Sequence, residues 1–169
     1  MSERDDVSAS QLVSSDAAGH DAHACLAFCL LDTHFHVVVG TPAPNLGRGM
    51  QWLLAPYAKD FNERHERLGN LFHSRFYSKR VRTPDQLVAT LVYVYLNPVR
   101  AGIVERAEIW SWSSYSATIG RHAAPDFLDR RAVLELIDPQ GDVAPMRLEL
   151  AVREARERDL TGTGVRHGV

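Results

Sequence analysis

Short apolar blocks with the residue preferences of strands occupy the first quarter of the chain. Residues 23–31 (HACLAFCLL) and 34–40 (HFHVVVG) are too short for typical helices and rich in strand-forming residues. Asp32 and Thr33 provide a turn between them, so two adjacent strands are predicted. Residues 75–81 (RFYSKRV) alternate well enough to predict a further strand.

Longer segments have the apolar spacing of helices. Asn45 can cap the first helix, which Pro56 should kink and Gly69 should end. The predicted helices cover residues 46–68, 84–97, 126–137 and 144–160. The last eight residues are expected to fray.

The segment after residue 83 is ambiguous, because its run LVYVYL favours a strand. Its boundaries favour a helix: Thr83 occupies an N-cap position, Pro84 the first helical position and Gln86 the place of a capping-box residue. We predict a helix that stops at Pro98, because proline disfavours helical geometry in the residue before it.

Composition indicates one soluble domain, with 45% apolar and 24% charged residues in a chain of 169. No apolar run approaches the ~18 residues that span a membrane, and the polar N-terminus is unlike a signal peptide, so the cytoplasm is expected. Cys25 and Cys29 lie in an apolar run and are predicted to be buried free thiols.

Charge is distributed unevenly along the chain, although the net charge is only −2. Residues 33–106 carry ten basic and five acidic residues, while both flanking regions are net acidic. Residues 64–82 contain six Lys or Arg residues and one acidic residue, interleaved with Phe72, His73, Phe76 and Tyr77. Cations among aromatic rings suit single-stranded nucleic acid, and a solvated charged surface is the alternative.

Two histidines, His34 and His36, project from the same side of a predicted strand, with Cα atoms roughly 6.5–7 Å apart. Two imidazoles at that distance can bind one metal ion, although an exposed strand edge without a role is also possible. Zinc bound together with Cys25 and Cys29 is disfavoured, because four residues of strand separate those two backbones by roughly 13 Å.

Tyr93 and Asn97 share one face of the predicted helix, whereas Tyr95 points elsewhere. A phenol ionises near pH 10, so tyrosine is a feasible nucleophile for nucleic-acid strand transfer. A divalent ion held by His34, His36 and the Asn97 carbonyl would polarise a phosphate. These neutral ligands favour Mg²⁺ or Mn²⁺, with Zn²⁺ still possible. The alternative is that Tyr93 and Asn97 are core and cap residues.

Several blocks in uninterrupted order resemble the REP-associated tyrosine transposases of the HUH single-tyrosine superfamily. The blocks are the His-x-His strand, NLGRGMQWL, NERHERLGNLFHSRF, YVYLNPVRAGIVERAEIWSWSSY and FLDRRAVLEL, within about residues 24–155. The resemblance divides the chain into an N-terminal arm (1–23), a transposase domain (24–120) and a helical C-terminal extension (121–169).

The resemblance implies an α+β, ferredoxin-like antiparallel sheet with helices packed on it. It also implies that Tyr93 is the nucleophile, that Asn97 joins His34 and His36 on the metal, and that the substrate is a single-stranded DNA hairpin. We expect a monomer that cleaves and rejoins DNA through a 5′-phosphotyrosine intermediate. The residues expected to contact DNA are Arg64, Arg67, Arg75, Phe76, Lys79, Arg80, Arg82 and Arg100.

The chain departs from the family pattern in three places. Asp32 and Thr33 replace the usual Pro-Asn, Pro56 interrupts a helix, and residues 1–23 have no counterpart of the first strand. A missing strand would leave the 34–39 backbone without its usual partner, so we expect a truncated or wrongly started chain of marginal stability and weak activity. A hairpin-binding remnant that does not cut DNA is the main alternative, and a metal enzyme unrelated to DNA is the third.

Overall fold

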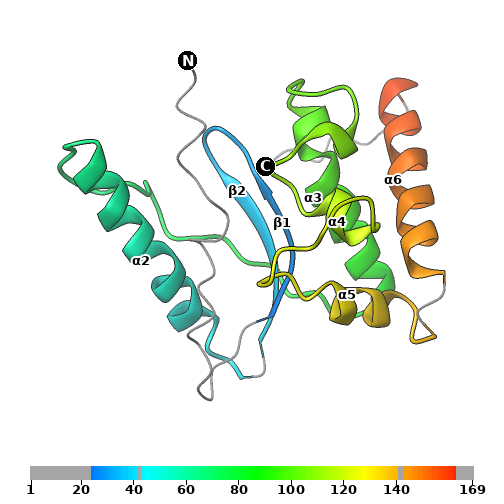
Figure 1. Ribbon diagram of the computed structural model, residues 1–169, viewed down its shortest axis with the longest axis horizontal. Coiled ribbons are helices and arrows are strands. Elements are labelled where there is room, and N and C mark those ends of the chain that lie inside the picture. Colours follow the sequence, from blue (N-terminus) through cyan, green and yellow to red (C-terminus); the bar gives the residue numbers. More distant parts are fainter. Residues whose placement is uncertain (1–23, 42, 141–142, 163–169) are drawn as a thin grey trace. The chain divides into compact units, whose positions relative to one another are not determined.

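The computed structural model describes residues 24–41, 43–140 and 143–162 (Figure 1). The elements are β1 (Ala24–Leu30), β2 (Phe35–Gly40), α2 (Leu46–Arg64), α3 (Pro84–Arg100), the 3-10 helix η2 (Ala107–Ile109), α4 (Tyr115–Thr118), α5 (Arg130–Ile137) and α6 (Ala144–Leu160). They form two compact units. The α2 unit comprises, among the described residues, Ala24 and 40–80, and the sheet unit comprises 25–39 and 81–162.

The sheet of the sheet unit is an antiparallel hairpin of β1 and β2, as predicted. The Leu31 amide donates to the His34 carbonyl across the turn at 2.9 Å. Four residues of β1 are buried, so this strand is apolar on both faces. The α+β class is confirmed, and a ferredoxin-like arrangement is compatible with this hairpin and the helices packed on it.

The second edge of β1 is also hydrogen-bonded, although no regular strand lies there in the described part of the chain. The backbone bonds run from Leu30 N–H to Trp112 C=O (2.9 Å), from Ser114 N–H to Phe28 C=O (3.0 Å) and from Asp129 N–H to Cys25 C=O (2.8 Å). The Trp110 indole adds a fourth by donating to the Leu30 carbonyl at 2.9 Å. Thus β1 is central, with its polar backbone satisfied on both sides.

The helical core of the sheet unit is built around α3, which packs against α5 and α6 (Figure 1). Leu91, Tyr95 and Leu148 are completely buried there. The Tyr95 hydroxyl is 3.0 Å from Thr118 Oγ1, and its ring lies 5.0 Å from that of Tyr115. Burial raises the pKa of Tyr95 to about 12, so this phenol stays protonated at neutral pH.

Both cysteines are buried free thiols on β1, as predicted. Burial raises the pKa of each thiol, Cys25 and Cys29, to about 12. Both thiols therefore stay protonated at neutral pH.

The start of α3 follows the predicted capping pattern. The Gln86 amide donates to Thr83 Oγ1 at 3.2 Å, and the Gln86 side chain accepts from the Arg82 amide at 2.9 Å. The first bond satisfies a donor that the first helical turn leaves unpaired, whereas the Gln86 side chain bonds to the amide of Arg82, one residue before the Thr83 amide that a capping box would use.

The predicted end of α3 at Pro98 is wrong, because the helix continues to Arg100. Beyond it, Gly102 (φ +69°) donates to the Val99 carbonyl at 3.0 Å, and Ile103 donates to the Pro98 carbonyl at 2.9 Å. This pair of bonds is the Schellman motif that ends helices. The two bonds use the carbonyls of Pro98 and Val99, so the helix ends in a capped turn that includes the proline.

Other helix boundaries differ from the predictions by several residues. α2 ends at Arg64 rather than residue 68, since Glu66 takes a positive φ of 48°, and the helix continues through Pro56. Asn45 occupies its N-cap position without a side-chain capping bond. α5 starts at Arg130, where the Asp129 carboxylate accepts from the Ala132 amide, and α6 has the predicted bounds.

The predicted strand over 75–81 is wrong. Residues 75–80 are all exposed and irregular. Side chains on both faces of the segment are exposed, so its alternating pattern does not separate a buried face from an exposed one. Residues 1–23 and 163–169, which include the predicted arm and most of the fraying end, lie outside the described residues.

Replacing Gly102 with Ala tests how α3 ends. An added Cβ would meet no atom within 4 Å, so the cost comes from the positive φ alone. We expect Gly102→Ala to lower the free energy of unfolding by about 1–2 kcal/mol in a denaturant titration. Gly102→Asn, whose side chain tolerates this conformation, should lose less; equal losses would contradict the assignment.

Candidate active site

The two histidines of the His-x-His pattern lie at the start of β2. Their ring centroids are 5.1 Å apart in an edge-on arrangement, with an interplanar angle of 88°. Thr33 Oγ1 lies 3.2 Å from His34 Nδ1, which leaves Nε2 of His34 as the nitrogen open to a ligand. The hairpin therefore brings both imidazoles to one place, as the strand periodicity predicts.

His36 has an unsatisfied nitrogen. Its Nε2 atom is buried and has no hydrogen-bond partner among the described residues. Burial lowers the pKa of His36, the nearby His34 lowers it further, and the side chain of Asn97 acts in the opposite direction. The imidazole is thus neutral at pH 7, the form in which histidine binds metal ions.

Tyr93 and Asn97 of α3, the other two predicted site residues, lie beside His36. The Tyr93 ring is 5.4 Å from the His36 ring, again edge-on at 83°. The Asn97 amide nitrogen donates to the Tyr93 carbonyl at 3.1 Å, and the Asn97 side chain also interacts with His36. Helix periodicity predicted that Tyr93 and Asn97 share one face of α3. In the structure His36 lies beside that face, and His34 lies next to His36.

Tyr93 and Tyr95 differ sharply in accessibility. Tyr93 is 39% exposed, whereas Tyr95 is 0% exposed and bonded to Thr118. Only the first of these phenols can reach a macromolecular substrate.

Arg100 occupies the same face of α3 two turns beyond Tyr93. Its guanidinium carbon lies 5.7 Å from the centre of the Tyr93 ring, and its Nε bonds to Asp159 of α6 at 2.9 Å. Arg100 was expected to contact DNA, but its place over the Tyr93 ring was not predicted. Asp159 was missed because an ion pair across 59 residues leaves no local spacing signal.

The donor atoms fit a divalent cation with few protein ligands. His34, His36 and the Asn97 oxygen are neutral N and O donors, and the unpartnered Nε2 of His36 is the kind of buried atom that a cation satisfies. In the described ranges no cluster of three or more His, Cys, Asp and Glu side chains is found. An ion here would therefore depend on Asn97 as its third protein ligand.

The predicted DNA-contacting residues divide between the two units. Arg82 and Arg100 belong to the sheet unit, and both are exposed. Within the α2 unit, Arg67 lies 5.7 Å over the Phe61 ring, an exposed stacked cation. The other five residues are also exposed and belong to the α2 unit: Arg64, Arg75, Phe76, Lys79 and Arg80.

Comparison with known proteins gives one informative similarity. The chain is 25% identical over 118 residues to a Haemophilus influenzae protein named as a REP-associated tyrosine transposase, covering 63% of this chain and 67% of that protein. No family model matches the chain, and no solved structure matches it significantly. The match supports distant kinship with the REP-associated tyrosine transposases.

Membrane-spanning segments were sought in the part of the chain that the structure describes. None of its helices combines the length and the hydropathy that crossing a bilayer requires.

Paramagnetic Mn²⁺ tests the metal site without any assay of activity. In NMR spectra we expect Mn²⁺ to broaden the ring signals of His34 and His36 before those of the other six of the eight histidines. His36→Ala should raise the Mn²⁺ concentration that half-broadens His34 at least about tenfold, because one of the ligands is lost.

His73→Ala is the control, since His73 is an exposed residue of the α2 unit. It should leave the Mn²⁺ response of His34 unchanged. Uniform broadening of all histidines would place the ion elsewhere.

Proposed function

We propose that this protein is a transposase-type enzyme that cuts and rejoins single-stranded DNA through a covalent bond to Tyr93. The observation that carries the proposal is the edge-on contact of Tyr93 with His36 at 5.4 Å. It brings an accessible phenol together with the imidazoles of the His-x-His pattern from a distant part of the chain. The name of the distant relative supports the same class of reaction.

In the proposed reaction, the Tyr93 hydroxyl oxygen attacks a DNA phosphorus and loses its proton to water. The bond from phosphorus to the 3′ oxygen breaks, and that oxygen takes a proton, which leaves a free 3′ hydroxyl and a 5′-phosphotyrosine ester. One phosphate ester replaces another, so the bond energy is kept. A second 3′ hydroxyl can then displace Tyr93 and reseal the strand.

His34, His36 and Asn97 would hold Mg²⁺ or Mn²⁺ beside the reacting phosphate. Such an ion supplies Lewis-acid polarisation of a phosphate oxygen when it is bound. The three side chains are neutral and leave its charge uncompensated, which favours an anionic phosphate as the next ligand. Arg100 adds positive charge above the Tyr93 ring, and Asp159 keeps its guanidinium in place.

The proposed substrate is a DNA hairpin with single-stranded flanks. The basic residues from Arg64 to Arg82 supply charge for phosphates, and exposed rings among them supply surfaces for unpaired bases. Phosphate contacts of this kind would set an affinity that falls with salt.

Tyr93→Phe is the direct test. We expect wild-type protein with a 5′-flanked, labelled hairpin oligonucleotide and Mn²⁺ to give a covalent adduct that survives denaturing electrophoresis, and EDTA to prevent it. Tyr93→Phe should abolish the adduct and leave DNA binding within about twofold, because only the nucleophilic oxygen is removed.

The matched control is Tyr95→Phe, which removes a hydroxyl two residues away. It should retain adduct formation but lose about 1 kcal/mol of stability, since the bond to Thr118 is lost. Binding without any adduct in wild type would indicate a hairpin-binding remnant instead of a transferase. An adduct formed by Tyr93→Phe would refute the assignment of the nucleophile.

A further inference from the structure

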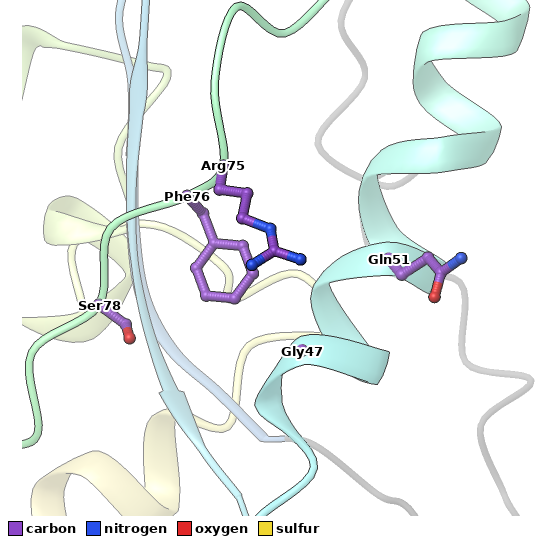
Figure 2. A pocket seen from close by; sticks show the side chains of 5 residues that line it. All are labelled: Gly47, Gln51, Arg75, Phe76 and Ser78. Atoms are coloured by element: carbon purple, nitrogen blue, oxygen red, sulfur yellow. The ribbon is translucent and has the colours of Figure 1, made fainter.

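A cavity lies within the α2 unit, apart from the residues proposed for catalysis. It has a volume of about 680 Å³ and is lined by Gly47, Gln51, Arg75, Phe76 and Ser78 (Figure 2). That volume falls in the range of roughly 300–1,000 Å³ typical of small-ligand sites. Its lining joins the first turns of α2 to the exposed segment 75–80.

The side chains in this cavity suit a nucleotide. Figure 2 shows the Arg75 guanidinium and the Phe76 ring side by side, both extending from the segment 75–78 toward α2. An aromatic face stacks on a nucleobase, and a guanidinium beside it bonds to a phosphate. Among the described residues, the five that line the cavity include one cation and no carboxylate, which suits an anion.

Gly47 leaves space on the opposite wall. A Cβ built on this residue would meet nothing within 4 Å, and its φ is not in the positive range. Among the described residues, neither packing nor backbone conformation requires glycine here. Without a side chain, this residue leaves room for a flat group to approach the helix closely.

We infer that this cavity binds one unpaired nucleotide of single-stranded DNA, with the base against Phe76 and Gly47 and a phosphate on Arg75. The inference rests on the proposed function, since it gives the DNA flank a place on the protein. Gln51 and Ser78 also line the cavity, but the main contact is the stacking of the base on Phe76. The site therefore tolerates different bases and requires that a base be present.

The test compares two fluorescent ten-residue strands, oligothymidylate and a fully abasic strand with the same number of phosphates, bound in EDTA. Wild type should prefer oligothymidylate. Phe76→Ala should weaken its affinity about tenfold and leave that of the abasic strand unchanged. Trp52→Ala is the aromatic control, since Trp52 is 60% exposed on α2 and does not line the cavity, and it should change binding less than about twofold.

A second variant tests the cavity from its other wall. Gly47→Leu should fill the space, reduce the preference for oligothymidylate about as much as Phe76→Ala, and leave the melting temperature equal or higher. A drop in melting temperature would show that Gly47 serves the fold and would overturn its assignment to the site.

The outcomes separate this inference from the proposed function. Equal affinity of wild type for the two strands, or unchanged affinity in both variants, would overturn the nucleotide site even where the Tyr93 adduct forms. Loss of the base preference in both variants, with no adduct in wild type, would uphold the site and refute the transferase.

Discussion

The contact between His36 and Tyr93 is the constraint on which the candidate site depends, because it requires a strand and a helix to be placed together correctly. A shift of one residue in β2 would turn both histidines to the other face of the hairpin. A shift of one residue in α3 would rotate Tyr93 by about 100° around the helix. The register of β2 is fixed by its pairing with β1, and the rotation of α3 is fixed by the packing of its buried face.

β1 sets the strand register through its two bonded edges. Its partner on one side is β2, and on the other the backbone near Trp112, Ser114 and Asp129 takes the place of a regular strand. Burial of Cys25, Ala27 and Cys29 holds this strand in the core. The apolar character of β1 thus fixes β2, and β2 in turn fixes the distance between the imidazoles.

Local patterns predicted the components of the site, but not their assembly. Period two placed His34 and His36 together, and the helical period placed Tyr93 with Asn97, because each rule acts within one element. The bond between Asp159 and Arg100 joins residues on different helices, so no such rule could find it. The segment 75–81 was misjudged for a related reason, since alternation predicts a strand only where a surface exists to bury one side.

The misjudged end of α3 has a chemical consequence. Tyr93, Asn97 and Arg100 lie at positions i, i+4 and i+7, which form one stripe only if the helix continues past Pro98. Had proline ended the helix, Arg100 would have left that stripe and the cation would not lie over the Tyr93 ring. The Schellman motif at Gly102 keeps the final turn helical, and Asp159 then fixes the guanidinium from α6. The glycine that ends α3 therefore helps to hold the Arg100 guanidinium over the ring of the proposed nucleophile.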